Sequence, residues 1–250
     1  MLKKRIMIAE VGKYALFMSR TLKFPERFRV FRQLVVDEVD KLVLQSIPIV
    51  ILISTFMGAV LAIQTAYNIE NPFIPMTMVG YTVVTTSILE FSPTIISLIL
   101  AGKVGSRIAS EIGSMRINEQ IDALEVMGIN SANYLLLPKI TATVFFNPFI
   151  IIISMFFSTL GGYIVGLLTG FFSPEEYITG IRIDFKVYNV VYALIKTVVF
   201  AFIITSVAGF MGYFVKGGAE GVGKASTSAV VWSSILIIVF NLILTQLLLV

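Results

Sequence analysis

Two charged side chains interrupt long apolar runs, and they are the residues best placed to bind a polar group inside a membrane. Glu90 is the only charged residue between positions 73 and 102, and Lys196 is the only one between 187 and 214. A charge at the centre of a bilayer costs about 2.5–3.5 kcal/mol on insertion scales, so it usually has a partner or lines a polar cavity. The sequence therefore predicts that both side chains serve a structural or functional purpose.

The positions of the two charges along their runs indicate that they can meet. At 1.5 Å per residue, Glu90 lies about 18 Å from Gly102, and Lys196 lies about 13 Å from Val187 at the opposite side of the membrane. Because these distances add to nearly the hydrocarbon thickness of about 30 Å, both charges reach a similar depth. We expect a pair, direct or through one water molecule. The alternatives are that Lys196 extends outward to the membrane surface, or that it meets a lipid phosphate.

A proline three residues after Glu90 should distort the helix that carries it. Pro93 has no backbone N–H, so the carbonyl of Leu89 loses its usual donor and a kink is expected. Glu90 then has two interpretations: a structural carboxylate satisfied at the kink, or a group that lines a cavity.

A polar, helix-patterned segment at residues 111–138 separates two of the apolar runs. Apolar and acidic positions repeat there at three- or four-residue spacing, as on one side of a helix. The apolar positions are Ile117, Ile121, Leu124 and Met127, and the acidic ones are Glu119, Asp122 and Glu125. Gly128 follows, where helices commonly end. A short amphipathic helix at about residues 115–128 predicts a docking site for another protein.

The composition excludes several catalytic chemistries. The chain has no Cys and no His, so it holds no disulfide, thiolate metal site or imidazole base. Residues 218–225, GAEGVGKA, are close to a phosphate-binding loop, but Ala225 replaces the Ser or Thr that binds Mg²⁺ and no strand precedes the segment. We interpret it as a flexible cytoplasmic turn and expect no metal, cofactor or catalytic residue on this chain.

The apolar runs determine the expected fold class. The chain is 57% hydrophobic and 14% charged, against about 25% charged in soluble domains. About 20 apolar residues cross a bilayer as a helix, and these runs lack the alternation of barrel strands. The sequence predicts an all-α polytopic membrane protein with five spans: Leu42–Tyr67, Phe73–Gly102, Ile140–Gly170, Val187–Phe214 and Ser226–Val250. The third run is long enough for one tilted or kinked helix followed by an outer loop.

Basic residues predict the orientation. Sixteen of the 19 Lys and Arg residues lie in 1–41, 103–139 and 215–225, and cytoplasmic loops are enriched in both residue types. The N-terminus and the docking segment are therefore expected in the cytoplasm, and the C-terminus on the outer side. The net charge of +4 follows from this bias and does not indicate nucleic-acid binding.

The first 41 residues are expected to form a cytoplasmic interfacial helix and an elbow. Glu10 and Lys13 interrupt the apolar run after MLKKR, and no small-residue cleavage site follows, which argues against a signal peptide. A helical stripe surrounded by cations is typical of a helix lying on an anionic leaflet. The stripe is Met7, Val11, Tyr14, Met18 and Leu22. The elbow is Lys23–Arg32, and residues 42–250 complete a single 1–250 domain. The alternative is a first span that is frayed at its start.

Small and polar residues recur inside the later runs. Ser158, Gly162, Gly166 and Gly170 repeat at four-residue intervals, which predicts close helix packing rather than a ligand site. Near the C-terminus, polar side chains either face a pathway or make hydrogen bonds within the membrane; they are Asn241, Thr245 and Gln246.

Four segments resemble the MlaE family of ABC-transporter permeases, the membrane subunits of MCE-type lipid transport systems. The longest is AGKVGSRIASEIGSMRINEQIDALEVMGIN (Ala101–Asn130), and the others are ILEFSPT (Ile88–Thr94), IKTVVFA (Ile195–Ala201) and GVGKASTSAVVWSS (Gly221–Ser234). Residues 122–124, Asp-Ala-Leu, with Gly128 are also similar to the EAA loop of ABC importer permeases, although Pro138 falls closer to the glycine than in that loop.

The resemblance implies a homodimeric permease with an interfacial helix and five spans. In such a system a cytoplasmic coupling helix contacts an ATPase subunit, which carries ATP and Mg²⁺, and a periplasmic MCE-domain protein sits on the dimer. The expected substrates are phospholipids or other lipids, moved between the bacterial inner membrane and the periplasm or outer membrane. ILEFSPT matches a family segment that lines the lipid pathway, which favours a cavity-lining role for Glu90.

Two candidate sites follow. The ATPase-coupling residues are Glu119, Gln120, Ile121, Asp122, Leu124, Glu125 and Met127. The lipid-cavity residues are Leu61, Gln64, Glu90, Pro93, Lys196 and Asn241. One alternative is a secondary transporter or channel with Glu90 as a proton or ion site, which the odd number of spans and the lack of an internal repeat disfavour. Another is a structural scaffold, which leaves Glu90 and Lys196 without a purpose.

Overall fold

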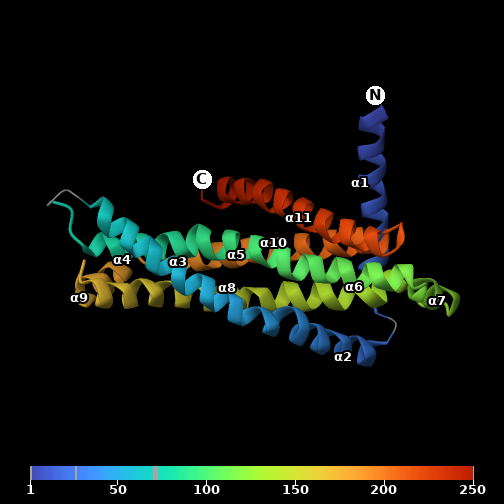
Figure 1. The fold of residues 1–250 in the computed structure, drawn as a ribbon, viewed down its shortest axis with the longest axis horizontal. Coiled ribbons are helices and arrows are strands. Elements are labelled where there is room, and N and C mark those ends of the chain that lie inside the picture. The colour runs from blue at the N-terminus through green and yellow to red at the C-terminus, as the bar shows by residue number, and fades with distance from the viewer. Residues whose placement is uncertain (1, 26, 70–72, 250) are drawn as a thin grey trace. The chain divides into compact units, whose positions relative to one another are not determined.

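The computed structural model describes residues 2–25, 27–69 and 73–249, with side chains described from Ala9 onward. Every regular element in these ranges is helical, which confirms the all-α prediction (Figure 1). The first part contains α1 (Leu2–Thr21), α2 (Phe28–Glu38), the π-helix η1 (Val39–Val43), the 3₁₀ turn η2 (Leu44–Ser46), α3 (Ile47–Asn68), α4 (Thr77–Thr86) and the π-helix η3 (Ser87–Ile95). The remainder contains α5 (Ile96–Leu100), the π-helix η4 (Ala101–Gly105), α6 (Ser106–Ile117), α7 (Gln120–Val126), α8 (Ser131–Thr169), α9 (Pro174–Arg182), α10 (Val187–Tyr213) and α11 (Gly218–Leu249).

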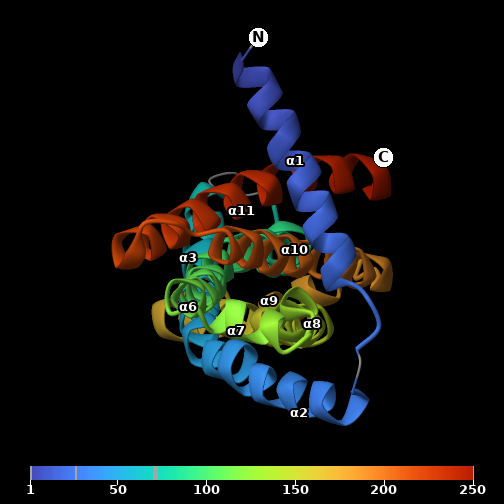
Figure 2. The same cartoon turned by 90° about the vertical axis from the view of Figure 1, so that its right-hand side faces the viewer.

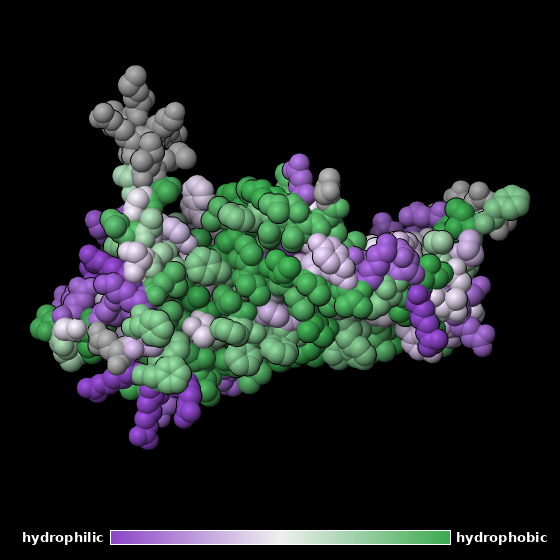
Figure 3. Space-filling view, turned by 180° about the vertical axis from the view of Figure 1, so that it is seen from behind, coloured by the Kyte–Doolittle hydropathy of each residue, from purple (hydrophilic) through white to green (hydrophobic). Residues whose placement is uncertain are grey.

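Five helical stretches in the described residues are long and apolar enough to cross a membrane, which agrees with the predicted number. They are Phe28–Asn68, Thr77–Ile117, Ser131–Thr169, Val187–Tyr213 and Gly218–Leu249. Figure 3 shows the broad hydrophobic surface that such helices expose.

Several helices extend further than the predicted spans. The first stretch begins 14 residues before Leu42, the second ends 15 residues after Gly102, and the last begins eight residues before Ser226. The predicted bounds followed charge-free windows, but charged residues do not end a helix. Helix ends instead coincide with left-handed glycines: Gly128 after α7 has φ 78° and Gly170 after α8 has φ 69°.

The GAEGVGKA segment is helical, so its interpretation as a flexible turn is wrong. Helix α11 begins at Gly218, and the left-handed turn lies just before it at Gly217, where φ is 93°. Lys224 pairs with Glu220 one turn earlier at 2.7 Å, a spacing that supports a helix. A continuous helix offers no loop to surround a phosphate.

The third run forms one helix, as predicted, followed by a short helix that the sequence analysis missed. Helix α8 has 39 residues, or about 58 Å at 1.5 Å per residue. After it, a capping box starts α9: the Glu176 amide donates to Ser173 Oγ at 3.2 Å, and the Ser173 amide donates to Glu176 Oε2 at 2.8 Å. The capping-box sequence Ser-Pro-Glu-Glu at 173–176 was the available signal.

Contacts divide the chain into two compact units, each built from three separate segments. Unit 1 comprises Met1–Leu44, Leu98–Phe145 and Phe200–Val239. Unit 2 comprises Gln45–Ser97, Phe146–Val199 and Phe240–Val250.

In unit 2, small residues let helix backbones approach closely. A Cβ atom on Gly58 of α3 would collide with the backbone of Ser158 in α8. The predicted close helix packing is confirmed at Ser158, whereas Gly162 and Gly166 instead make room for side chains, since a Cβ on Gly162 would meet the Tyr177 hydroxyl and a Cβ on Gly166 would meet the Phe172 ring. Hydroxyl pairs join α8 to both α3 and η3. Ser54 of α3 donates to Ser154 at 2.8 Å, Ser154 donates to Ser92 of η3 at 2.9 Å, and Ser87 of η3 lies 2.7 Å from Ser158.

We predict that Gly58→Ala destabilises the folded chain by about 1–3 kcal/mol, because the added methyl group overpacks a contact made by backbone atoms. Thermal unfolding in detergent measures the effect. Gly223→Ala in α11 is the matched control, since a Cβ there meets nothing within 4 Å. An equal change in stability for the two variants would show that the α3–α8 approach does not depend on glycine.

In unit 1, α1 lies beside α10 (Figure 2), and aromatic side chains pack it against the end of that helix. The ring of Phe17 lies 5.9 Å from that of Phe210 and 4.8 Å from that of Tyr213, and the Tyr14 hydroxyl donates to Ser206 Oγ at 2.7 Å. Of the predicted stripe, Tyr14 is half-buried and Met18 is buried, whereas Val11 and Leu22 are exposed. Met7 lies outside the described side chains. The buried face is therefore rotated toward Phe17, which the predicted stripe omitted.

Candidate functional site

Glu90 and Lys196 form an ion pair in unit 2. Glu90 lies in η3 and Lys196 in α10, and Nζ of the lysine is 2.9 Å from Oε1 of the glutamate. The Lys196 side chain is 0% exposed, while that of Glu90 is 45% exposed. The predicted pair is confirmed as a direct contact. Because Lys196 is fully buried, its side chain does not extend to the surface of the protein.

Lys196 also bonds to the carbonyl that Pro93 leaves without its usual donor. Its Nζ donates to the carbonyl oxygen of Leu89 at 3.3 Å. The predicted distortion at Pro93 takes the form of the π-helix η3, in which the Ile96 amide bonds to the carbonyl of Phe91 five residues earlier. The charge and the proline are thus parts of one local structure.

Hydroxyl groups surround the other side of the ammonium. Lys196 Nζ donates to Tyr192 Oη at 2.7 Å and to Thr245 Oγ1 at 3.3 Å, and these two hydroxyls are 2.8 Å apart. Tyr192 is fully buried, and its ring centroid lies 4.6 Å from Nζ. An ammonium has three N–H donors, so its acceptors in this structure account for all of them.

The carboxylate of Glu90 is held through its second oxygen. Oε2 accepts from Asn241 Nδ2 and from Thr94 Oγ1, each at 3.0 Å. Thr94 Oγ1 is also 3.0 Å from Asn241 Oδ1. The interactions join η3, α10 and the end of α11 in a group that we call the polar cluster: Glu90, Thr94, Tyr192, Lys196, Asn241 and Thr245.

The polar cluster is suited to orienting a ligand rather than to covalent chemistry. Its ammonium is enclosed, whereas the Glu90 side chain is 45% exposed and Asn241 is half-buried. Mutual hydrogen bonds fix these groups, so they present a constant polar edge. Apolar binding sites use a small number of such fixed polar groups to set the orientation of a ligand.

The structure brings together four of the six lipid-cavity candidates: Glu90, Pro93, Lys196 and Asn241. Leu61 instead packs against the apolar cluster of Ala62 and Phe172, and Gln64 is exposed. The prediction missed Thr94 and Tyr192, although each lies four residues from a charge that it contacts, Glu90 or Lys196. That helical spacing was the signal that could have identified them.

The docking segment consists of two helices rather than one. Helix α6 ends at Ile117, and Glu119 has a left-handed backbone with φ 59° before α7 begins. Figure 2 looks onto α7, which lies beside the ends of α6 and α8. At its C-terminus, Gly128 donates to the carbonyl of Glu125 at 2.9 Å and Ile129 to that of Leu124 at 3.0 Å. This Schellman motif confirms the predicted helix end at Gly128.

The apolar residues of α7 divide between the interior and the surface. Ile121 is 0% exposed and anchors α7 to unit 1, and Leu124 is half-buried. Val126 is 88% exposed and Met127 is 65% exposed. An exposed apolar pair at a helix end is available to a partner protein. The predicted apolar positions include Met127 but not Val126, which falls outside the three- and four-residue pattern.

Two of the acidic residues have partners within the chain. Asp122 Oδ1 is 2.6 Å from Arg116 Nη1, and both side chains are at least one-third exposed. Glu125 Oε1 accepts from the hydroxyls of Tyr213 at 2.7 Å and Ser131 at 3.0 Å. These hydrogen bonds, that from Tyr213 first, lower the pKa of the Glu125 carboxyl below its usual value. Glu119, Gln120, Asp122 and Glu125 are all exposed, so the accessible surface of this segment keeps the acidic character of its sequence.

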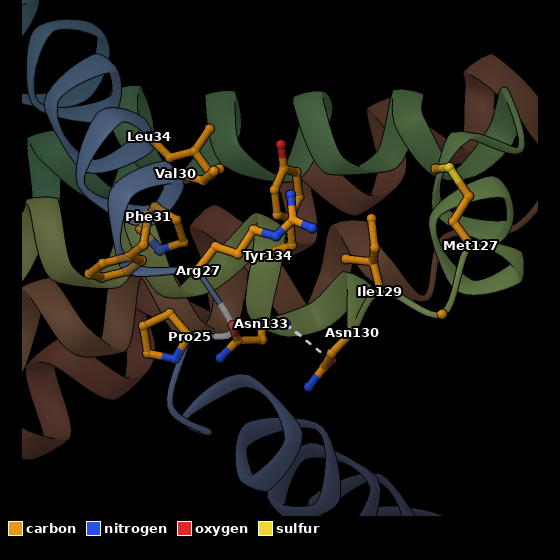
Figure 4. A pocket seen from close by; sticks show the side chains of 12 residues that line it. Pro25, Arg27, Val30, Phe31, Leu34, Met127, Ile129, Asn130, Asn133 and Tyr134 are labelled. Carbon is orange, nitrogen blue, oxygen red and sulfur yellow. Dashed lines mark hydrogen bonds between the residues drawn. The ribbon is translucent and has the colours of Figure 1, made fainter.

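A pocket of about 560 Å³ lies beside α7 in unit 1 (Figure 4). Met127 lines one side and Val30, Phe31 and Leu34 of α2 line the other, with Arg27 between them. The amide of Asn133 donates to the carbonyl oxygens of Thr21 and Lys23 and so fixes the end of α1 against α8. The exposed end of α7 is therefore continuous with a concave, mixed surface.

Comparison with known proteins identifies the family. The model of the family described as Permease MlaE matches residues 35–247. A "Probable ABC transporter permease protein" of Rickettsia bellii is 35% identical over 98% of this chain and 95% of its own length. The "Intermembrane phospholipid transport system permease protein MlaE" of Haemophilus influenzae is 30% identical over 85% of this chain and 81% of its own length. The Arabidopsis thaliana "Protein TRIGALACTOSYLDIACYLGLYCEROL 1, chloroplastic" is 31% identical over 81% of this chain and 57% of its own length.

The matched range covers the polar cluster and both helices of the docking segment. It also covers nearly all of the five apolar helical stretches. The fold is polytopic and all-α, and the matches to relatives named as ABC transporter permeases extend over almost the whole sequence. The chain therefore belongs to the MlaE permease family.

Proposed function

We propose that this chain is the lipid-conducting membrane subunit of an ATP-driven, MCE-type transporter that moves phospholipids or other lipids. The observation that carries the proposal is the polar cluster, in which the half-exposed Glu90 side chain is paired with a fully buried ammonium within predominantly apolar helical stretches. The name of the Haemophilus influenzae relative, which refers to phospholipid transport, supports the choice of substrate.

In the proposed mechanism, apolar side chains accommodate the acyl chains and the polar cluster positions the headgroup. The Glu90 carboxylate accepts hydrogen bonds from the headgroup and the Asn241 amide donates to it, while Lys196 balances the carboxylate charge. The chain itself performs no bond-breaking chemistry. ATP and Mg²⁺ bind to a partner ATPase, which docks on the exposed end of α7. Movement of the ATPase displaces α7 and so opens or closes the lipid site.

The proposed assembly contains two copies of this chain, the cytoplasmic ATPase and a periplasmic MCE-domain protein. It lies in the bacterial inner membrane, with the N-terminus cytoplasmic and the C-terminus periplasmic. The distribution of Lys and Arg residues supports this orientation. Arg27, which lies between α7 and α2 in the pocket of Figure 4, supports a cytoplasmic position for this end of the chain, because basic residues concentrate on that side.

Photo-crosslinking tests the lipid site. Leu244 lies three residues after Asn241 on α11, so a photoreactive residue there shares the helix face of the polar cluster without replacing any of its members. After extensive detergent washing, we expect it to capture phospholipid identified by mass spectrometry. Ile152 of α8 is the control, because its exposed side chain, 45% exposed, contacts bulk lipid or detergent. Equal capture at Leu244 and Ile152 after washing would contradict a specific lipid site.

A further inference from the structure

A buried ion cluster in unit 1 lies outside both candidate sites. Lys139 of α8 donates to Glu38 of α2 at 2.7 Å and to Glu111 of α6 at 2.9 Å. The side chains of Lys139 and Glu38 are 3% and 9% exposed, whereas that of Glu111 is 37% exposed. One enclosed ammonium therefore joins three helices.

The three joined helices include the one that leads directly into the docking helix. Helix α6 runs into α7 through the turn at Asn118 and Glu119, and the two helices are in contact. Helix α2 begins the first apolar helical stretch. A second hydrogen bond ties α6 to the π-helix that directly follows α2, because Arg107 of α6 donates to the carbonyl of Lys41 in η1 at 3.0 Å. These contacts form a continuous connection from α7 through α6 to α2 and α8.

The two contacts of Lys139 differ in how readily they can be broken. Glu38 is enclosed, and its Oε2 has no hydrogen-bond partner among the described residues, so losing Lys139 would strand a buried charge. Glu111 borders an open hollow of about 360 Å³ lined by Lys41, Arg107, Ser110 and Ser114. Water in that hollow can replace Lys139 as a partner of Glu111.

We infer that Lys139 is a positioning residue that couples the docking helix to the first apolar stretch. The Glu38–Lys139 contact stays closed, and the Lys139–Glu111 contact opens and closes as α6 moves. This inference rests on the proposed function, because it takes α7 as the contact with the ATPase.

A distance measurement on the chain without its ATPase tests whether the contacts of Lys139 fix the position of α7 relative to α2. The sequence has no Cys, so paired spin labels can be placed at Val36→Cys on α2 and Val126→Cys on α7, both exposed positions. We expect a narrow distance distribution in the otherwise unaltered chain and a broadened or shifted one in Glu111→Gln. Glu220→Gln is the control, because it removes a carboxylate from an ion pair whose two side chains are both exposed and should leave the distribution unchanged.

The variants that break the ion cluster separate a coupling role from a merely structural one. Lys139→Met leaves Glu38 buried without a cation and should lower the unfolding temperature most. The double variant Glu38→Met with Lys139→Met removes both buried charges. Its unfolding temperature should therefore be higher than that of Lys139→Met, while the coupling of α6 to α2 remains lost. In the complex with the ATPase, we expect Glu111→Gln and this double variant to bind the ATPase normally. In both variants the number of lipid molecules moved per ATP hydrolysed should fall about tenfold or more, because a hydrogen bond between charged groups is worth at least about this factor.

Each outcome decides the inference. An unchanged distance distribution in Glu111→Gln, or normal coupling in the stable double variant, overturns it. If the unaltered chain binds no ATPase, the proposed function fails. The distances between the spin labels then test the inference alone. A broadened or shifted distribution in Glu111→Gln supports the positioning role of Lys139, and an unchanged distribution overturns that role.

Discussion

Replacing Glu90 by Gln should destabilise the chain more than replacing Lys196 by Met. In Glu90→Gln the ammonium of Lys196 stays fully buried with only neutral partners, and removing one member of a buried pair costs about 3–5 kcal/mol. In Lys196→Met the carboxylate remains half-exposed and keeps its bonds from Thr94 and Asn241. Thermal unfolding in detergent and lipid transfer by the reconstituted complex measure the two effects.

The double variant distinguishes coupling from independent losses. Glu90→Gln with Lys196→Met carries no stranded charge, so its loss of stability should be smaller than the sum of the single losses by about 0.5–3 kcal/mol. Tyr192→Phe is the matched control, because it removes one hydrogen bond to Lys196 and leaves both charges in place. Strictly additive losses for Glu90 and Lys196 would show that the ion pair contributes no mutual stabilisation.

Val126→Asp together with Met127→Asp should release the partner ATPase. Both side chains are exposed at the end of α7, so the substitutions remove an apolar contact surface without disturbing the buried anchor Ile121. Truncating a central interface residue commonly costs about 2 kcal/mol or more, which corresponds to about a 30-fold weaker Kd. Affinity purification of the tagged permease followed by quantification of the ATPase measures the loss.

The control for docking is Val11→Asp on α1, a substitution of the same type at a position that is 67% exposed. It should retain the ATPase. Normal recovery of the ATPase with the α7 double variant would place the docking surface elsewhere on the chain. Changes at Leu124 or Glu125 are less informative, because Leu124 is half-buried and Glu125 bonds to Tyr213 and Ser131.

Regular helix geometry made the central contact predictable. Because a helix rises by a constant amount per residue, counting from the ends of two apolar runs placed Glu90 and Lys196 at similar depth before any contact was known. The same regularity predicts that residues four apart share a face, which accounts for Thr94 and Tyr192. Helix ends were less predictable, since α2 and α6 continue through charged residues that a hydropathy window treats as boundaries.

The direction in which a helix face points depends on tertiary packing, which spacing alone does not determine. Leu61 and Gln64 share the first predicted span, yet one packs in an apolar cluster and the other is exposed. Lys139 entered the sequence analysis only as a cytoplasmic charge. Its partners Glu38 and Glu111 lie 101 and 28 residues away in segments expected to be polar, so no local pattern connected them.

The most direct test of the account is ATP-dependent lipid movement by the reconstituted complex of this chain with its ATPase. Labelled phospholipid leaving proteoliposomes should be measured with ATP and with a non-hydrolysable analogue, for the unaltered chain and for Glu90→Gln with Lys196→Met. We predict transfer that requires hydrolysis in the unaltered complex and is lost in the double variant, although that variant still binds the ATPase. Equal transfer with ATP and with the analogue, or full transfer by the double variant, would contradict the account.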